Sequence, residues 1–159
     1  MKVKHYLIRF ILPLVWPLIK LYWRIVKPKT YGVRVLLIHP HDDQKVLLVQ
    51  HSYGNRSLWN IPGGGYKPKK ERPIEAAKRE MKEEFGQELV DPKELGLYET
   101  AGEGKRDTVT IITGSLGSVV FGNLDPEISQ VSWETMDLVL TRDDVAKVVK
   151  HAVRLISHK

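Results

Sequence analysis

The chain has 159 residues, enough for one domain with a hydrophobic core and too few for two domains of ordinary size. Its apolar fraction of 42% and charged fraction of 28% are typical of a globular protein and exclude a disordered chain. The absence of cysteine excludes disulfides, thiolate metal sites and a cysteine nucleophile, whereas a net charge of +6 raises the question of nucleic-acid binding.

The positive charge is concentrated at the N-terminus. Residues 1–30 contain no acidic residue and seven basic residues: Lys2, Lys4, Arg9, Lys20, Arg24, Lys27 and Lys29. The remaining 129 residues carry a net charge of −1, because the whole chain carries +6. Duplex binding requires a basic patch on the folded domain itself, so we expect no nucleic-acid partner.

Residues 1–29 are predicted to form a hydrophobic and basic helix ahead of a domain at residues 30–159. The longest uncharged run of this segment, residues 10–19, holds two prolines and is shorter than the roughly 20 apolar residues that span a bilayer. The residues that follow it, 21–24, are bulky, which argues against a signal-peptide cleavage site.

Basic residues of this segment fall on one stripe of the predicted helix, among them Arg9, Lys20 and Arg24. Helices with such a stripe lie on anionic membrane surfaces. The alternative is that the helix packs against its own domain, or against a second copy of the chain in a homodimer. Because the lack of cysteine also suits a reducing compartment, we expect a cytoplasmic protein, with the inner membrane face as its candidate anchor.

Residues 33–38 and 46–49 are apolar runs rich in β-formers, and we predict that they pair as a hairpin. The polar stretch between them contains two histidines and two aspartates: His39, His41, Asp42 and Asp43. These residue types could form a metal cluster, but the position between two strands favours a turn.

Three glycines follow at residues 63–65, after an apolar approach that begins at Trp59. They do not match a P-loop, because no second glycine followed by Lys and Ser or Thr comes at the required spacing. Pro73 is predicted to open a helix that ends near Phe85, with Gly86 as its terminator.

The rest of the chain is predicted to supply three strands and a closing helix. The strands are expected at residues 95–100, 108–113 and 118–121. The helix is expected to begin at Thr141, where Asp144 would complete a capping box, and its apolar residues recur at one helical face. Several strands together with two separate helices predict an α/β fold in which the sheet lies between the helices.

Three carboxylates share one face of the helix predicted after Pro73. On a helical wheel, Glu80, Glu83 and Glu84 fall within an arc of about 100°, beside the apolar face. Like charges this close repel one another, and a hard cation such as Mg²⁺ removes the repulsion because it takes oxygen ligands. The alternative is a solvated acidic surface, stabilised by an Arg79–Glu83 pair.

The spacing of these residues favours the metal site. The pattern resembles the signature of the Nudix hydrolase family at seven fixed positions: Gly65, Glu71, Arg79, Glu80, Glu83, Glu84 and Gly86. The resemblance extends over residues 31–159. Gln87 is a departure, since the family usually has an aliphatic residue there, and we expect it to affect packing after the turn more than metal binding.

The resemblance implies an α/β/α sandwich with a mixed β-sheet, and it assigns the metal ligands. Glu80 and Glu84 would bind the metal, and Glu83 would be a further ligand or a base that acts on the attacking water. The backbone carbonyl of Gly65 would be another ligand.

The same resemblance implies supporting roles. Arg79 would hold the carboxylates in place, and Glu71 would orient Arg79 or an outer metal. Many relatives take a general base from a later loop, for which Glu127 is the first candidate and Glu103 the second.

Three residues are candidate substrate contacts. Arg56 and Lys67 could meet phosphate charge, and Trp59 could stack on a nucleobase. The alternatives are ordinary surface charges for the first two and core packing for the tryptophan.

The resemblance therefore implies a pyrophosphohydrolase that depends on Mg²⁺, with Mn²⁺ as a substitute, and that acts on a small nucleotide. We expect a nucleoside diphosphate linked to another group, of the ADP-ribose or nucleotide-sugar type. The alternatives are a nucleoside triphosphate pyrophosphatase and a Nudix-like module that binds nucleotides without cleaving them. Residues 102–105, where some relatives carry a substrate-marking proline or tyrosine, contain neither, so the sequence does not select the substrate.

Overall fold

The computed structural model describes most of the chain: residues 29–100, 106–122 and 124–157. Two predictions fall outside these residues, namely the basic helix before Lys29 and the second candidate base, Glu103. Within the described residues, no helix is long and apolar enough to cross a membrane. Of the described residues, 31–98 together with 109–157 form one unit by their contacts, and residues 29–30, 99–100 and 106–108 fall outside it. This unit contains both hydrophobic cores and all the described helices.

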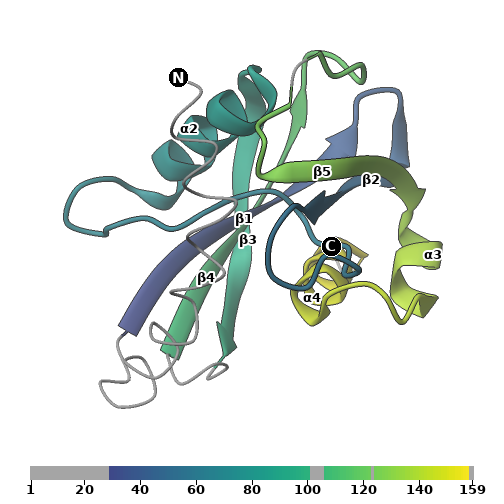
Figure 1. Cartoon of the computed structure of the whole chain (residues 1–159). Coiled ribbons are helices and arrows are strands. Elements are labelled where there is room, and N and C mark those ends of the chain that lie inside the picture. Colours follow the sequence, from purple (N-terminus) through teal and green to yellow (C-terminus); the bar gives the residue numbers. More distant parts are fainter. Residues whose placement is uncertain (1–28, 101–105, 123, 158–159) are drawn as a thin grey trace. The chain divides into compact units, whose positions relative to one another are not determined.

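A five-stranded mixed β-sheet is the framework of the fold, with the strand order β3-β4-β1-β2-β5 (Figure 1). The strands are β1 (Lys29–His39), β2 (Asp42–His51), β3 (Leu89–Thr100), β4 (Arg106–Leu116) and β5 (Ile128–Thr135). β1 and β2 form the predicted antiparallel hairpin, with Ile38 opposite Val46. On its other side β2 pairs antiparallel with β5, where Leu47 lies opposite Trp133.

The hairpin turn between β1 and β2 is held by local hydrogen bonds. The backbone N–H of His41 donates to Nδ1 of His39 at 3.2 Å, and that of Gln44 donates to Oδ1 of Asp42 at 3.1 Å. Short polar side chains that bond the backbone two residues away stabilise turns. The predicted hairpin turn is confirmed at residues 40 and 41, whereas His39 ends β1 and Asp42 and Asp43 begin β2.

Helices cover both faces of the sheet. They are α2 (Pro73–Phe85) on one face and α3 (Met136–Thr141) and α4 (Lys147–Ser157) on the other. Each face has its own buried cluster of aliphatic side chains, because a sheet packed on both sides must present apolar residues to both. The predicted sandwich is confirmed (Figure 1).

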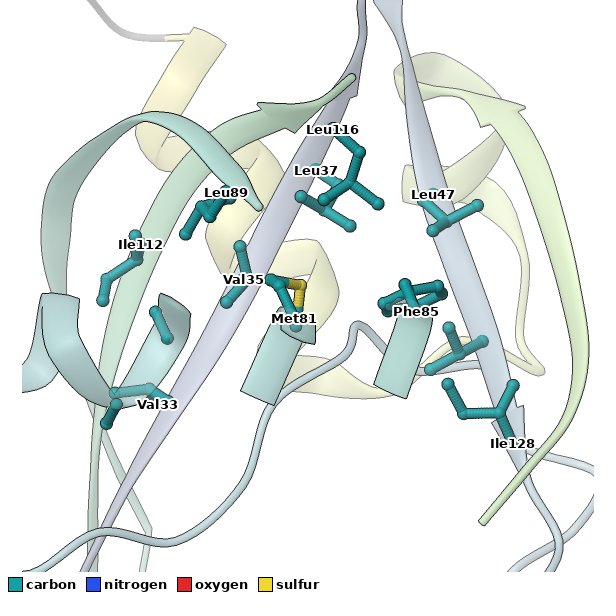
Figure 2. Close-up of a cluster of buried hydrophobic side chains, with 13 residues drawn as sticks. Val33, Val35, Leu37, Leu47, Met81, Phe85, Leu89, Ile112, Leu116 and Ile128 are labelled. Carbon is teal, nitrogen blue, oxygen red and sulfur yellow. The ribbon is translucent and has the colours of Figure 1, made fainter. Parts of the chain in front are cut away.

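Side chains alternate between the two faces along the central strands. In β1, Val35 and Leu37 point toward α2, whereas Leu36 belongs to the cluster on the α4 side. Figure 2 shows Met81 and Phe85 of α2 packed among the side chains of these strands. The face of α2 that the sequence predicted to be buried is therefore the one that anchors this helix.

Both ends of α2 are fixed by local chemistry. Pro73 occupies the first turn, where its missing N–H costs nothing, and the N–H of Arg72 donates to the side chain of Glu75 at 2.9 Å. At the other end Gly86 adopts a left-handed conformation with φ 68°, and its N–H donates to the carbonyl of Lys82 at 3.0 Å. The predicted helix limits are confirmed.

The strand predicted at residues 118–121 is wrong. The hydroxyl of Ser118 instead donates to the carbonyl of Val120 and accepts from its N–H, both at 3.1 Å, which closes a compact turn. A serine hydroxyl that bonds nearby backbone offers an alternative to a strand ladder. The strand that does follow, β5, begins only at Ile128.

The predicted start of the last helix is also wrong. Thr141 ends α3, an element that was not predicted, and its hydroxyl donates to the carbonyl of Leu138 at 3.0 Å. The last helix begins at Lys147, so Asp144 lies in the connection between the two helices. The buried face of this helix is as predicted and includes Val149 and Ala152.

Candidate active site

The glycine-rich segment lies between β1 and β2, where these two strands diverge. It is hydrogen-bonded to both strands, through Val35 N to Pro62 O and Val33 N to Gly64 O at 2.9 Å each, and through Val49 and Asn60, which bond each other in both directions at 2.8 Å. An irregular segment with this many backbone partners is held in one position. Its carbonyl and N–H groups are therefore fixed against the helix that follows.

Two of the three glycines are needed for steric reasons. Gly63 has a φ of 130°, and a Cβ there would lie 2.3 Å from the carbonyl oxygen of Val33. A Cβ on Gly64 would lie 2.4–2.6 Å from all three atoms of the Glu80 carboxylate. The glycines thus allow close packing of this segment on β1 and of α2 on the segment.

Glu84 is the buried carboxylate of the group, with 9% of the residue exposed. Its Oε1 lies 3.4 Å from the N–H of Gly63, and among the described residues its Oε2 has no hydrogen-bond partner. Burial raises the pKa of Glu84 to about 8; Glu80 and Glu127 add to this shift, and Arg34 opposes it. A buried acceptor without a donor is unusual and indicates that a further group belongs there.

Glu80 and Glu83 are progressively more exposed. The Glu80 side chain is 12% exposed, and burial raises its pKa against the opposing effect of Arg79. The Glu83 side chain is 58% exposed. The three carboxylates therefore range from buried to solvent-facing along one side of α2.

The guanidinium of Arg79 links most of the predicted site. Its Nη1 donates to Glu80 at 2.7 Å and to Glu83 at 3.3 Å, while Nη2 and Nε donate to the two oxygens of Glu71 at 3.0 and 3.2 Å. Nη2 also reaches the carbonyl of Gly65 at 3.3 Å. The hydrogen bonds to Glu71 are the largest cause of the raised pKa of Arg79. Among the described residues, no three acidic or histidine side chains converge on one point, and the guanidinium lies between these carboxylates.

A second polar group adjoins Glu84, and sequence reasoning missed three of its members. Arg34 in β1 donates to the carbonyl of Gly63. Burial, followed by the charge of the nearby Glu127 carboxylate, raises the pKa of Tyr53 to about 12. The His51 ring lies 5.4 Å from that of Tyr53, and burial lowers the pKa of His51. The sequence offered one signal for this group, namely that Arg34 is a charged residue within the apolar run of β1. His51 and Tyr53 gave no such signal, because only the pairing of distant strands brings them near Glu84.

Glu127, the candidate base from a later loop, belongs to this second group. Its carbonyl accepts from the N–H of Ser52 at 2.8 Å, and its charge contributes to the raised pKa of Glu84. The structure therefore brings it close to the carboxylates of α2.

The structure places the three candidate substrate contacts in different surroundings. Arg56 and Lys67 are exposed. Trp59 packs in the cluster on the α4 side, with the guanidinium of Arg142 5.5 Å from its ring centre. Because α2 covers the opposite face of the sheet, the tryptophan contributes to core packing.

The model of the NUDIX domain family matches residues 28–155 of the chain. The chain belongs to the Nudix family. It is a hydrolase of acid anhydrides in phosphorus-containing compounds, in a family whose substrates are small nucleotides and whose members generally use divalent metal ions. No curated protein matches the chain significantly in sequence.

Solved Nudix structures share this fold. A NUDIX hydrolase from Nitrosomonas europaea is 23% identical, with a TM-score of 0.67 over 82% of this chain and 89% of that one. The MutT protein from Methanosarcina mazei Go1 is 24% identical, with a TM-score of 0.69 over 84% and 96%. A UDP-X diphosphatase is 20% identical, with a TM-score of 0.64 over 82% of this chain and 63% of its own. Identities this low show a common fold and do not identify a substrate.

The two crowded glycines should respond differently to an added methyl group. Gly63→Ala should lower the free energy of unfolding of this Nudix hydrolase by more than about 2 kcal/mol, because the clash is with backbone and the φ is unfavourable. Gly64→Ala should lower the free energy of unfolding by less, because the end of the Glu80 side chain can move aside. Urea unfolding measures both. Gly117→Ala is the control, since nothing lies within 4 Å of its added Cβ; equal losses in all three variants would refute the assigned packing.

The raised pKa of Glu84 predicts how stability depends on pH in the metal-free protein. The unfolded state releases this proton near the ordinary pKa of 4.5, whereas the folded state keeps it until about pH 8. The folded state therefore binds more protons in between, so Glu84 makes stability fall as pH rises from about 4.5 to 8. Urea unfolding in EDTA at several pH values, for wild type and Glu84→Gln, isolates this contribution. The two proteins should be similar near pH 5 and differ most near pH 8, and a constant difference would contradict the assignment.

Proposed function

We propose that this Nudix hydrolase uses Mg²⁺, with Mn²⁺ as a substitute, to cleave the diphosphate of a nucleoside diphosphate linked to another group. ADP-ribose and nucleotide sugars are the candidate substrates. The observation that carries the proposal is the buried Oε2 of Glu84, which has no partner among the described residues and lies near a second acid, Glu80.

The donor atoms available here suit a hard divalent cation. Glu80 and Glu84 would hold it, with Glu83 and the carbonyl of Gly65 as further oxygen ligands, and Mg²⁺ prefers oxygen ligands. When bound, such an ion neutralises diphosphate oxygens and lowers the pKa of a coordinated water. The charge of Glu80 adds to the raised pKa of Glu84, and a bound cation would remove this repulsion.

Glu71 supports this arrangement by holding Arg79. Two of the guanidinium nitrogens bond Glu71, and the third is shared by Glu80 and Glu83. Glu80 and Glu83 can therefore turn away from Arg79 toward a bound ion, while the two hydrogen bonds to Glu71 keep the guanidinium in place. In this proposal Arg79 orients the acids before and after an ion binds.

Two acids can accept the proton of the attacking water. Glu83 is exposed and lies on the same helix as the proposed ligands, with Arg79 as its partner at 3.3 Å. Glu127 comes from the connection before β5, where its backbone carbonyl accepts from the N–H of Ser52 at 2.8 Å. We propose Glu83 as the base, with Glu127 as the alternative.

Replacing Glu83 should lower the rate of hydrolysis without changing the fold. Glu83→Gln should lower turnover by at least about 100-fold, because a positioned base contributes roughly that much, and the fold should be unchanged. The measurement is a screen of ADP-ribose, nucleotide sugars and nucleoside triphosphates with Mg²⁺, with release of phosphorylated products as the readout. Glu88→Gln, the same change at an exposed position paired with Lys82, is the matched control and should retain full turnover.

The same screen decides between the alternative functions. Equal rates for wild type and Glu83→Gln would remove Glu83 from the mechanism. Pyrophosphate release from nucleoside triphosphates would replace the proposed substrate class, and nucleotide binding without turnover would favour a non-catalytic module.

Metal binding itself can be tested through Gly64. Gly64→Ala should displace the Glu80 carboxylate and weaken Mn²⁺ binding by roughly 10- to 100-fold, the usual effect of disturbing the support of a metal ligand. Electron paramagnetic resonance of free Mn²⁺ measures this affinity, and Gly117→Ala should bind as wild type does. Should the wild-type protein take up no Mn²⁺ or Mg²⁺ at millimolar concentrations, the metal-dependent mechanism is wrong.

A further inference from the structure

Gln87 directly follows the left-handed Gly86 that ends α2, at the position where the family usually has an aliphatic residue. Its side chain is half-buried, and its Oε1 accepts a hydrogen bond from the backbone N–H of Ser118 at 2.9 Å, across 31 residues of sequence. An aliphatic side chain has no acceptor and could not make this bond.

The stretch that Gln87 holds is the connection between β4 and β5, described here by residues 117–122 and 124–127. Ser118 lies near its start and closes the compact turn with Val120. Phe121 follows, and its ring lies 5.2 Å from that of Phe85 in the last turn of α2 and 6.3 Å from that of Trp133.

The other end of the connection is fastened to the same turn of α2. The N–H of Asp125 donates to the backbone carbonyl of Glu84 at 3.0 Å, and Oδ1 of Asp125 accepts from the N–H of Glu127 at 2.8 Å. One helical turn therefore directs the Glu84 carboxylate toward the site while its carbonyl, the Phe85 ring and the adjacent Gln87 hold the connection.

We propose that Gln87 is a positioning residue. Its carboxamide oxygen fixes the connection between β4 and β5 to the end of α2, and thereby fixes the place of Glu127 relative to the carboxylates of that helix. The part of this inference that concerns catalysis rests on the proposed function with Glu127, the alternative base, as the acid that takes the proton. The part that concerns the connection does not.

Two substitutions at this position separate the acceptor from the side-chain volume. Gln87→Leu removes the acceptor and restores the type of residue usual in the family, whereas Gln87→Glu keeps an oxygen that can accept from Ser118. Amide hydrogen exchange by NMR, measured on the metal-free protein, reports the bond directly. Exchange at Ser118 should accelerate by about 3- to 10-fold in Gln87→Leu and stay near the wild-type rate in Gln87→Glu. The amide of Val49, bonded to Asn60, is the internal reference and should not change.

Turnover tests the consequence for the site. Gln87→Leu should lower kcat by about 3- to 10-fold with unchanged Mn²⁺ affinity. Gln87→Glu should keep the wild-type kcat. In a Glu127→Gln background the leucine substitution should have no further effect on kcat, because it acts through Glu127.

The possible failures are distinguishable. Unchanged exchange at Ser118 in Gln87→Leu, or equal acceleration in both variants, would overturn the positioning role. Faster exchange with unchanged kcat would overturn the link to Glu127. Absence of any turnover in wild type would contradict the proposed function and leave the exchange result as the test of the connection.

Discussion

The guanidinium of Arg79 links three of the four carboxylates that α2 and the segment before it contribute to the candidate site. It bonds Glu71, Glu80 and Glu83 together, while Glu84 remains buried beside the Gly63 N–H. Like charges this close would otherwise oppose the packing of α2 on the sheet. The position of the site thus depends on a cation that the chain supplies itself, and the divalent ion of the proposed mechanism would share Glu80 and Glu83 with it.

The crowding of the site explains its glycines. Gly63 accepts a conformation and a contact with β1 that no other residue could, and Gly64 leaves room for the carboxylate of Glu80. The backbone partners of this segment on both β1 and β2 keep it rigid. The proposed oxygen ligands would therefore stand on a fixed loop and on a helix that the apolar core anchors (Figure 2).

The end of α2 contacts both the carboxylate group of that helix and the connection that carries Glu127. Membership in the Nudix family accounts for the acids of this helix, whereas the place of Glu127 depends on how the connection between β4 and β5 is held. In this chain the support includes Gln87, Phe85 and the Glu84 carbonyl, all within one turn. A departure from the family pattern in the sequence therefore coincides with a specific contact in the structure.

The sequence by itself determined the helix from Pro73 to Phe85, its buried face and the Arg79 group, because helical periodicity and local capping depend on residues close in the chain. The resemblance to the Nudix signature singled out Gly65 and Glu71, both of which accept hydrogen bonds from Arg79. The pairing of β2 with β5, and with it the grouping of Arg34, His51 and Tyr53 near Glu127, was decided only by tertiary structure. Pairing between distant strands follows from which faces the whole core can bury together, and no local pattern encodes it.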